Sequence, residues 1–450
     1  MTDTTLTDSE PPTPADAPRG EVAGFDWKLA LLLLGTAALG VFAGAGWLIT
    51  VAALVVMIFL HELGHFLTAK WSGMKVTEFF LFFGPKIWSF KRGETEYGIK
   101  CIPLGAYVRI IGMSNLDQEV APEDEPRTYR QQSYPQRLLV VCAGSIMHFL
   151  QALVLTVIVF SVLGVPGNTT LASRLGAPDP DPATWFIDSV SAHSAASRAG
   201  LEEGDHLVSI DGSAVDDFSD VGDLVEPNAG ERVELVVMRD GEEVTLTATL
   251  GSKPADPVDP DGPQQGFLGI SQGFPDPGTV RVNPLRGTIE AAQITYEGAQ
   301  QTVVGLASFF TGGVDDFASD VANGGSEPPA ASGSGAASTT TASGDQDTDR
   351  LVSIYGILRI GEAALDDGLW SFLLLMAGVN ISIGLLNMIP LLPLDGGHAA
   401  IATYERLRSR GGRRYMVDVS RLLPMTYAVF MFMMLLGLSA IYLDIVAPIG

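Results

Sequence analysis

Two histidines and a glutamate at residues 61–65 have the spacing needed to bind and use a metal ion. The segment reads His61-Glu62-Leu63-Gly64-His65, the pattern H-E-x-x-H. On a helix, residues i and i+4 share a face, so both imidazoles could bind one zinc ion. Glu62 would then serve as a general base that takes a proton from water. The alternative is a pair of histidines at the interfacial end of a membrane helix.

The surroundings of this motif favour the metal site. Residues 29–60 carry no charged side chain, and ionisable groups at the end of such a stretch are costly and usually functional. The extended pattern of many soluble zinc peptidases needs glycine at position 68 and histidine at position 71. The chain has Thr68 and Trp71 there, so we expect the third ligand in another membrane segment.

Asp395 is the candidate for that third ligand. It is the only acidic residue within 368–404, and it follows Pro390 and Pro393, which interrupt an apolar run. Irregular backbone at membrane depth is tolerated where it lines a cavity within the protein. His398 is an alternative ligand, although we expect it to face the membrane interface.

Long apolar runs predict a polytopic α-helical membrane protein with four core transmembrane helices. The runs cover residues 29–60, 138–165, 369–394 and 422–442. The first is long enough for one tilted helix or for two, so an extra N-terminal span at 29–46 stays open. Lys and Arg cluster between the first two runs and between the last two, which predicts that both loops are cytoplasmic.

The charge of the chain is concentrated in one region. The formal net charge is −25, and residues 166–350 hold 30 acidic and 8 basic residues. Because the two basic loops are predicted to be cytoplasmic and the spans alternate, this region is expected outside the cell. The charge argues against general nucleic-acid binding. The two cysteines, Cys101 and Cys142, exclude a disulfide scaffold.

The two motifs together resemble the site-2 protease family of intramembrane zinc metalloproteases. The second motif is N-x-x-P-x-x-P-L-D-G at residues 387–396, and the resemblance to actinobacterial members covers roughly 48–446. It implies Zn²⁺ bound by His61, His65 and Asp395, in a plasma-membrane enzyme whose active site lies near the cytoplasmic side. It also implies single-span membrane substrates such as anti-sigma factors.

Four further residues are candidates for substrate binding. The family usually has Gly-x-x-x-Asn in its second core span, whereas this chain has Gly144 followed by His148. Asn380 and Asn387 are two helical turns apart and share a face. Each of these polar residues could contact substrate or a neighbouring helix. Gly105 lies in a stretch, residues 94–111, that predicts short strands forming a membrane-associated β-hairpin. Its edge could pair with unwound substrate, or the stretch could be a plain cytoplasmic hairpin.

The extracytoplasmic part contains one segment, residues 185–251, that resembles a PDZ domain. In the family this domain is regarded as a gate that excludes substrates with an intact outer part. The expected organisation of the whole chain is a disordered tail (1–28), a first transmembrane region (29–70), a β region (71–136), a span (137–165), the PDZ domain (185–251), a strand and amphipathic-helix region (252–320), a flexible linker (321–350), a span with the LDG motif (351–398), a basic cytoplasmic loop (399–421) and a last span (422–447).

Two other functions were weighed against the protease. A metal-binding transporter should show internal repeats of spans, and the sequence shows none. A catalytically inactive scaffold that recruits partners through the PDZ domain is disfavoured by the intact Glu62 and Asp395.

Overall fold

The computed structural model describes residues 44–113, 120–178, 184–254, 264–275, 278–314, 352–409 and 415–446, with a few single positions between them. The predicted tail (1–28) and the predicted linker (321–350, apart from residue 321) lie outside these residues. So does most of the stretch 29–46, where an extra span is in question.

The helices of the described residues are α2 (Ala45–Trp71), α3 (Tyr134–Ile158), α4 (Thr170–Arg174), α5 (Ala195–Ala199), α6 (Phe218–Val225), α7 (Pro284–Ser308), α9 (Ile354–Asp367), α10 (Leu369–Asn387), α11 (Asp395–Arg408) and α12 (Leu423–Val446). The strands are β1 (Val76–Arg92), β2 (Thr95–Ile110), β3 (Val165–Pro166), β4 (Phe186–Val190), β5 (His206–Ile210), β6 (Ser213–Ala214), β7 (Arg232–Arg239), β8 (Glu242–Thr249), β9 (Gly251–Pro254), β10 (Gln264–Phe267), β11 (Ile270–Gly273) and β12 (Thr279–Val280).

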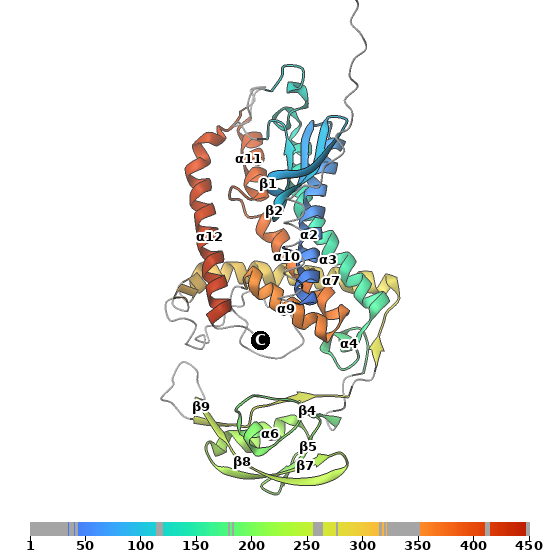
Figure 1. Cartoon of the computed structure of the whole chain (residues 1–450), viewed down its shortest axis with the longest axis vertical. Helices are drawn as coiled ribbons and strands as arrows, with labels where there is room; N and C mark the ends of the chain where they lie inside the picture. The colour runs from blue at the N-terminus through green and yellow to red at the C-terminus, as the bar shows by residue number, and fades with distance from the viewer. Residues whose placement is uncertain are drawn as a thin grey trace, which may run out of the picture.

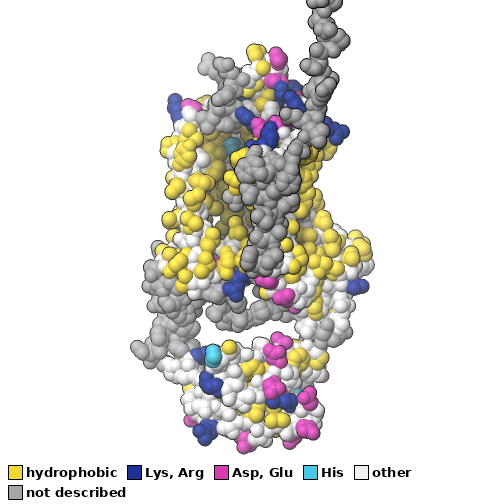
Figure 2. Space-filling view, viewed as in Figure 1, with side chains coloured by type: hydrophobic (Ala, Val, Ile, Leu, Met, Phe, Trp, Pro, Cys, Tyr) yellow, Lys and Arg dark blue, Asp and Glu magenta, His cyan; other side chains and the backbone are white. Residues whose placement is uncertain are grey.

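Four helical segments of the described residues are long and apolar enough to cross a membrane, and they match the four predicted runs. They are Ala45–Trp71, Tyr134–Leu163, Leu369–Asn387 and Val419–Val446. The shortest, α10, has 19 residues and would be about 28 Å long, close to the hydrocarbon thickness of a bilayer. Figure 2 shows hydrophobic side chains over this helical part.

Helices α2, α3 and α10 pack closely because small residues lie at their contacts. A β-carbon on Gly64 of α2 would lie 2.7 Å from the carbonyl oxygen of Ala143 in α3. A β-carbon on Gly384 of α10 would lie 3.0 Å from Cβ of His148 in α3. Close backbone approach of this kind is typical of helix packing in membranes.

The predicted span 351–398 consists of three helices in the structure. Gly368, with φ +131°, separates α9 from α10, because that backbone conformation strongly favours glycine. After α10 ends at Asn387, two prolines interrupt the chain and α11 begins at Asp395. The LDG motif therefore starts a separate helix, and the predicted basic loop 399–421 is helical as far as Arg408.

Strands β1 and β2 form a bent sheet beside α2. Residues 78–81 of β1 pair with residues 106–109 of β2 and also with residues 96–99, so this part of β1 lies between two parts of β2. The second half of β1 pairs with residues 95–100. The segment Ala106–Ile110 therefore pairs with β1 along one side, and β2 also contacts α2.

A separate β-domain, defined here as residues 185–274, is built around a four-stranded sheet in the order β6-β5-β7-β8. The predicted hairpin at Asp240-Gly241 joins β7 to β8, and both residues have positive φ. The domain continues past residue 251, where the sequence placed its end, because β11 pairs with β4 and Leu268 is buried in the domain core.

Figure 1 shows the β-domain beyond one end of the helices and α11 near the other end. Helix α7 crosses the helices near the β-domain and packs on α3 and α10, and its buried residues include the small residues Gly287, Ala291 and Gly305. Helix α12 lies to one side of α10 and α11 (Figure 1). Its end is attached to α9, because Asp444 Oδ2 accepts a hydrogen bond of 2.9 Å from the Ser353 backbone N–H.

Candidate metal centre

The structure brings His61, His65 and Asp395 together, although 330 residues separate Asp395 from His65 in the chain. The two Nε2 atoms lie 3.1 Å apart. Asp395 Oδ2 lies 3.4 Å from His61 Nε2 and 3.3 Å from His65 Nε2. The three donor atoms thus form a nearly equilateral triangle, which is the arrangement predicted for one metal ion.

The size of this triangle fits zinc. Ligand atoms about 2.0–2.1 Å from a tetrahedral zinc ion lie roughly 3.3–3.4 Å from each other. A further observation points the same way. Among the described residues, the buried atom Asp395 Oδ2, which faces both Nε2 atoms, has no hydrogen-bond partner. A carboxylate oxygen and two imidazole nitrogens facing one point are compatible with a shared cation.

The tautomer of His65 also suits a metal ligand. His65 Nδ1 lies 2.7 Å from the carbonyl oxygen of Val140 in α3, and a carbonyl only accepts hydrogen bonds. The proton of His65 is therefore on Nδ1, which leaves the lone pair of Nε2 directed at the metal position. A hydrogen bond to the second nitrogen is the usual way in which proteins orient a metal-binding histidine.

Gly144 of α3 leaves space for the rings of His61 and His65 because it has no side chain. A β-carbon at this position would lie 2.3 Å from His61 Cε1 and 2.5 Å from His65 Nε2. Any side chain larger than hydrogen would therefore collide with the two imidazole rings.

A buried ion pair holds α11, and with it Asp395, against α3. Arg137 Nη2 donates to Glu405 Oε2 at 2.6 Å, and both side chains are less than a tenth exposed. Glu405 Oε1 also accepts a hydrogen bond of 2.7 Å from the backbone N–H of Val417. Arg137 in turn lies over the ring of Tyr129. Asp395 and Glu405 belong to the same helix, so this pair fixes the direction from which the carboxylate approaches the histidines.

Glu62 faces the same site from the side of the β-sheet. Its carboxylate is within electrostatic reach of His65 and Asp395, and the backbone N–H of Val108 in β2 is placed to donate to it. The proposed base therefore lies between the metal position and the segment Ala106–Ile110.

The other predicted residues occupy different places. His148 is buried, with its ring centroid 4.9 Å from that of His61, and its Nδ1 lies 2.9 Å from Asn380 Oδ1. Asn380 is thus part of the contact between α3 and α10. Asn387 ends α10, and Gly105 lies in β2 with φ +83°. His398 lies one turn along α11 and is outside the group of three ligand atoms.

Sequence reasoning missed Arg137, Glu405 and Val108. Arg137 and Glu405 lie 268 positions apart, and no local pattern connects them. The one available signal was an arginine directly before the uncharged run 138–165, which topology alone explains.

Comparison with known proteins agrees with this geometry. The sequence matches the profile of Peptidase family M50 over residues 49–435. It is 32% identical over 427 residues to the zinc metalloprotease Rip1 of Mycolicibacterium smegmatis, a match that covers 90% of this chain and 98% of that protein. Rip1 of Mycobacterium tuberculosis H37Rv is 30% identical over 409 residues, 88% of this chain and 96% of the relative.

Among solved structures, a PDZ domain of the SdrC-like protein from Listeria monocytogenes is similar to 21% of this chain, at 18% identity and a TM-score of 0.17. The match covers 93% of that structure.

Proposed function

The chain belongs to peptidase family M50 and is a zinc metalloprotease of the site-2 type, and we propose that it cleaves single-span membrane proteins within their membrane segment. The observation that carries this proposal is the His61, His65 and Asp395 triangle. The two histidines lie on α2, which is long enough to cross a membrane, and Asp395 begins α11 shortly after α10, which is also long enough. Anti-sigma factors are the substrate class that the sequence resemblance favours.

We place the metal centre near the cytoplasmic face and the β-domain outside. Lysines and arginines gather near the ends of α2 and α11, which lie close to the metal centre. Short loops rich in such residues usually stay in the cytoplasm. The β-domain lies beyond the opposite end of the helices (Figure 1).

Three residues would hold the metal, and Glu62 would move the proton. Zinc, when bound, supplies a Lewis acid that activates water and polarises the scissile carbonyl. The carboxylate of Glu62 accepts the proton of the attacking water and then delivers it to the nitrogen of the leaving amine. The Val108 N–H orients the Glu62 carboxylate between these two positions.

The substrate would bind along the edge of β2. A helix hides its carbonyl groups in internal hydrogen bonds, so the segment to be cut has to unwind. The backbone of Ala106–Ile110 could replace those bonds by strand addition, and Val108 places this edge beside Glu62. Gly105, with its positive φ, would set the bend at which the edge begins.

His148, Asn380 and Asn387 complete the proposed substrate contacts. Asn380 Nδ2 donates to the Met376 carbonyl oxygen at 2.8 Å, so Asn380 Oδ1 accepts the proton of His148 Nδ1. His148 Nε2 is then an acceptor, suited to a peptide N–H of the substrate. Asn387, at the end of α10, would contact the substrate further along.

The β-domain would act as a PDZ-type gate at the outer end of the helices. Its strand order and buried core describe a folded unit of its own. Its bulk there would keep out substrates whose outer part has not been trimmed.

Replacing Glu62 with glutamine tests this proposal. We expect E62Q to keep one zinc per chain and to lose cleavage of a membrane-embedded single-span substrate in proteoliposomes by at least roughly 10³-fold. The matched control is E123Q, which changes an exposed glutamate between β2 and α3 and should leave the rate unchanged. Normal cleavage by E62Q would contradict the mechanism. If the wild type cleaved soluble peptides and no membrane-embedded protein, single-span membrane proteins would not be the substrate class.

A further inference from the structure

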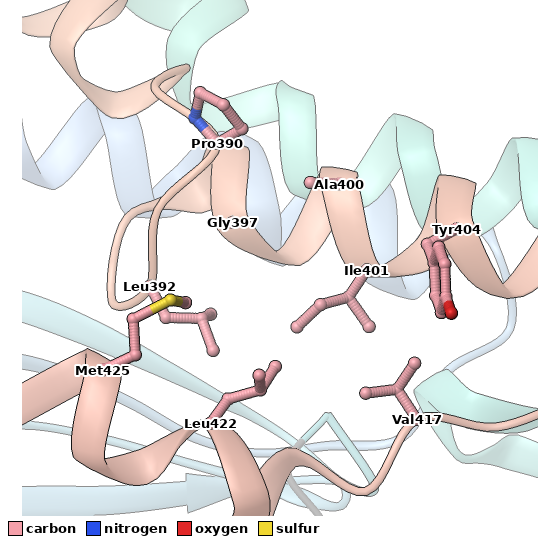
Figure 3. A pocket seen from close by; sticks show the side chains of 9 residues that line it. All are labelled: Pro390, Leu392, Gly397, Ala400, Ile401, Tyr404, Val417, Leu422 and Met425. Atoms are coloured by element: carbon pink, nitrogen blue, oxygen red, sulfur yellow. The ribbon is translucent and has the colours of Figure 1, made fainter.

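An apolar pocket lies between α11 and α12, and we call it the α11–α12 pocket. Its volume is about 250 Å³. It is lined by Pro390, Leu392, Gly397, Ala400, Ile401, Tyr404, Val417, Leu422 and Met425. Figure 3 shows Leu392, Ile401 and Leu422 extending into the gap from three different segments. None of the lining residues carries a charge.

The pocket is separate from the metal centre because it borders the other face of α11. Ala399, Ala402 and Glu405 follow the face of Asp395 and are buried on the side of α3. Ile401 and Tyr404 lie roughly 180–240° around the helix from Asp395. The pocket therefore takes no part in binding the metal.

The pocket lies at the edge of the bilayer. Leu422 and Met425 belong to the candidate span Val419–Val446. Helix α12 packs against α9 and against the short turn Val419–Leu422 that precedes α12. Many apolar side chains of α12 are exposed. An apolar gap open to lipid does not hold water well, and even a dry cavity of about 150 Å³ takes up a hydrocarbon such as benzene. A lipid acyl chain is the hydrocarbon available there.

The rim of the pocket is basic. Arg408 Nη1 donates a hydrogen bond of 2.8 Å to the hydroxyl of Tyr404, and its guanidinium lies 5.1 Å from the ring centroid of Tyr415. Arg421 directly precedes Leu422, and its side chain is 85% exposed. The nearby acid, Asp418, is 3.4 Å from Arg421 in an exposed pair, and such pairs are weak.

We propose that the α11–α12 pocket binds one acyl chain of an anionic phospholipid whose phosphate is held by Arg408 and Arg421. The apolar lining matches the chain, and the two guanidinium groups match a negatively charged headgroup. Binding requires neither the metal nor a peptide substrate, so this site goes beyond the proposed protease function.

The test uses the delipidated full-length protein in mild detergent. Phosphatidylglycerol and phosphatidylcholine with identical chains are added separately, and bound lipid is counted by native mass spectrometry. Two arginines that each favour a negatively charged headgroup should together give a preference of roughly thirtyfold. We therefore expect one phosphatidylglycerol per chain, bound that much more tightly than phosphatidylcholine.

Two variants separate the chain from the headgroup. A400F places an aromatic ring in the pocket and should weaken binding of both lipids by roughly tenfold, because a filled pocket cannot accept the chain. The double variant R408Q/R421Q should bring the preference for phosphatidylglycerol to within about threefold, because the net negative charge of its headgroup no longer meets the two guanidinium groups.

The matched controls are L438F, at a side chain of α12 that is 61% exposed, and R92Q, in β1. Both should bind lipid like the wild type. If A400F does not fold, a photoreactive acyl chain must label peptides 390–404 and 417–425 of the wild type. The proposal would be overturned if the wild type bound both lipids equally, or if A400F or R408Q/R421Q bound lipid like the wild type. It would also be overturned if the photoreactive chain labelled other peptides, or if the pocket crosslinked to a second copy of the chain. Because the readout is bound lipid, a failure of protease activity would leave this result unchanged.

Discussion

Gly144 lies directly against His61: a β-carbon on this glycine would be 2.3 Å from Cε1 of the imidazole. The same β-carbon would be 2.5 Å from Nε2 of His65, so the glycine touches both proposed nitrogen ligands. It comes from α3, while the histidines belong to α2. The distance between these two helices therefore determines whether the two nitrogens can converge on one ion.

The first prediction follows from this contact. G144A should lower zinc affinity by at least roughly tenfold, because the added methyl group displaces the two imidazole rings. The rate of cleavage should fall by at least the same factor. Zinc per chain, measured by elemental analysis after dialysis against a weak chelator, checks it.

The matched control is G437A on α12, where an added β-carbon meets nothing within 4 Å. It should keep its zinc and its activity. Full zinc content in G144A would show that the α2–α3 contact is looser than described.

The grouping of His61, His65 and Asp395 as a candidate metal site could be proposed from sequence because most of the necessary information is local. His61, Glu62 and His65 follow a helical spacing, and their position after an uncharged run gives them functional meaning. Asp395 was identifiable because it is the only acid in its stretch. Gly144 was noticed only as part of a motif, because its contact depends on how α3 packs on α2.

The fold was predictable to a similar degree. Long apolar runs predicted four helices that could cross a membrane. Alternating residues predicted β-structure at 94–111, but the structure has one long strand there, β2, which pairs with β1 at 76–92, where the predicted hairpin would have lain within 94–111. The return of β11 to β4 was missed, because Ile270 pairs with Val190 across 80 residues and turn signals do not encode such pairings. The helix break at Gly368 was missed because a single glycine, here after Asp366 and Asp367, is compatible with a continuous helix.

A second prediction concerns the buried pair of Arg137 and Glu405. E405L alone should strongly destabilise the protein, by about 3–5 kcal/mol, because it leaves a buried arginine without its partner. The double variant R137M/E405L should recover most of that loss, since an apolar pair of similar volume costs little. Thermal unfolding in detergent, followed together with zinc retention, measures both effects.

The zinc measurement separates positioning from general stability. If the pair aims Asp395 at the histidines, R137M/E405L should regain its melting temperature and still bind zinc more weakly than the wild type. Equal zinc affinity in the double variant would mean that other contacts fix α11.

A third prediction concerns His148. H148A should lower kcat/KM by roughly 10–100-fold, because it removes a proposed substrate contact and leaves Asn380 Oδ1 buried without its donor. H148N, which restores the amide usual in the family, can still donate to Asn380 and should stay within about threefold of the wild type. Cleavage of a membrane-embedded substrate gives the rates.

Zinc content is the control for His148, because its ring packs against His61. If His148 binds the substrate, H148A should keep its zinc and lose activity. If H148A loses zinc together with activity, His148 instead holds His61 in position for the metal.

The last prediction concerns acid stability of the β-domain. Burial alone would raise the pKa of Asp205, but hydrogen bonds from Arg239 and from the Glu202 backbone N–H outweigh it and hold the pKa below its ordinary value. Arg239 Nε and Nη2 donate to the two oxygens of Asp205, each at 2.7 Å. Since the pKa is lower in the folded protein, the pair stabilises the domain above the unfolded pKa of about 3.9, and this contribution is lost as the pH falls below that value.

D205N should therefore reduce the stability of the β-domain at pH 7 by about 3 kcal/mol, near the lower end of the range for a broken buried ion pair, because Arg239 is partly exposed. Hydrogen exchange of β5 and β7 in the full-length protein measures this loss. Between pH 6 and pH 3 the wild type should lose more protection than D205N, since the variant has already lost the charge. D211N, at the start of the β5–β6 turn, is the control for a surface acid. Parallel pH profiles for the wild type and D205N would show that Arg239 does not stabilise the ionised carboxylate.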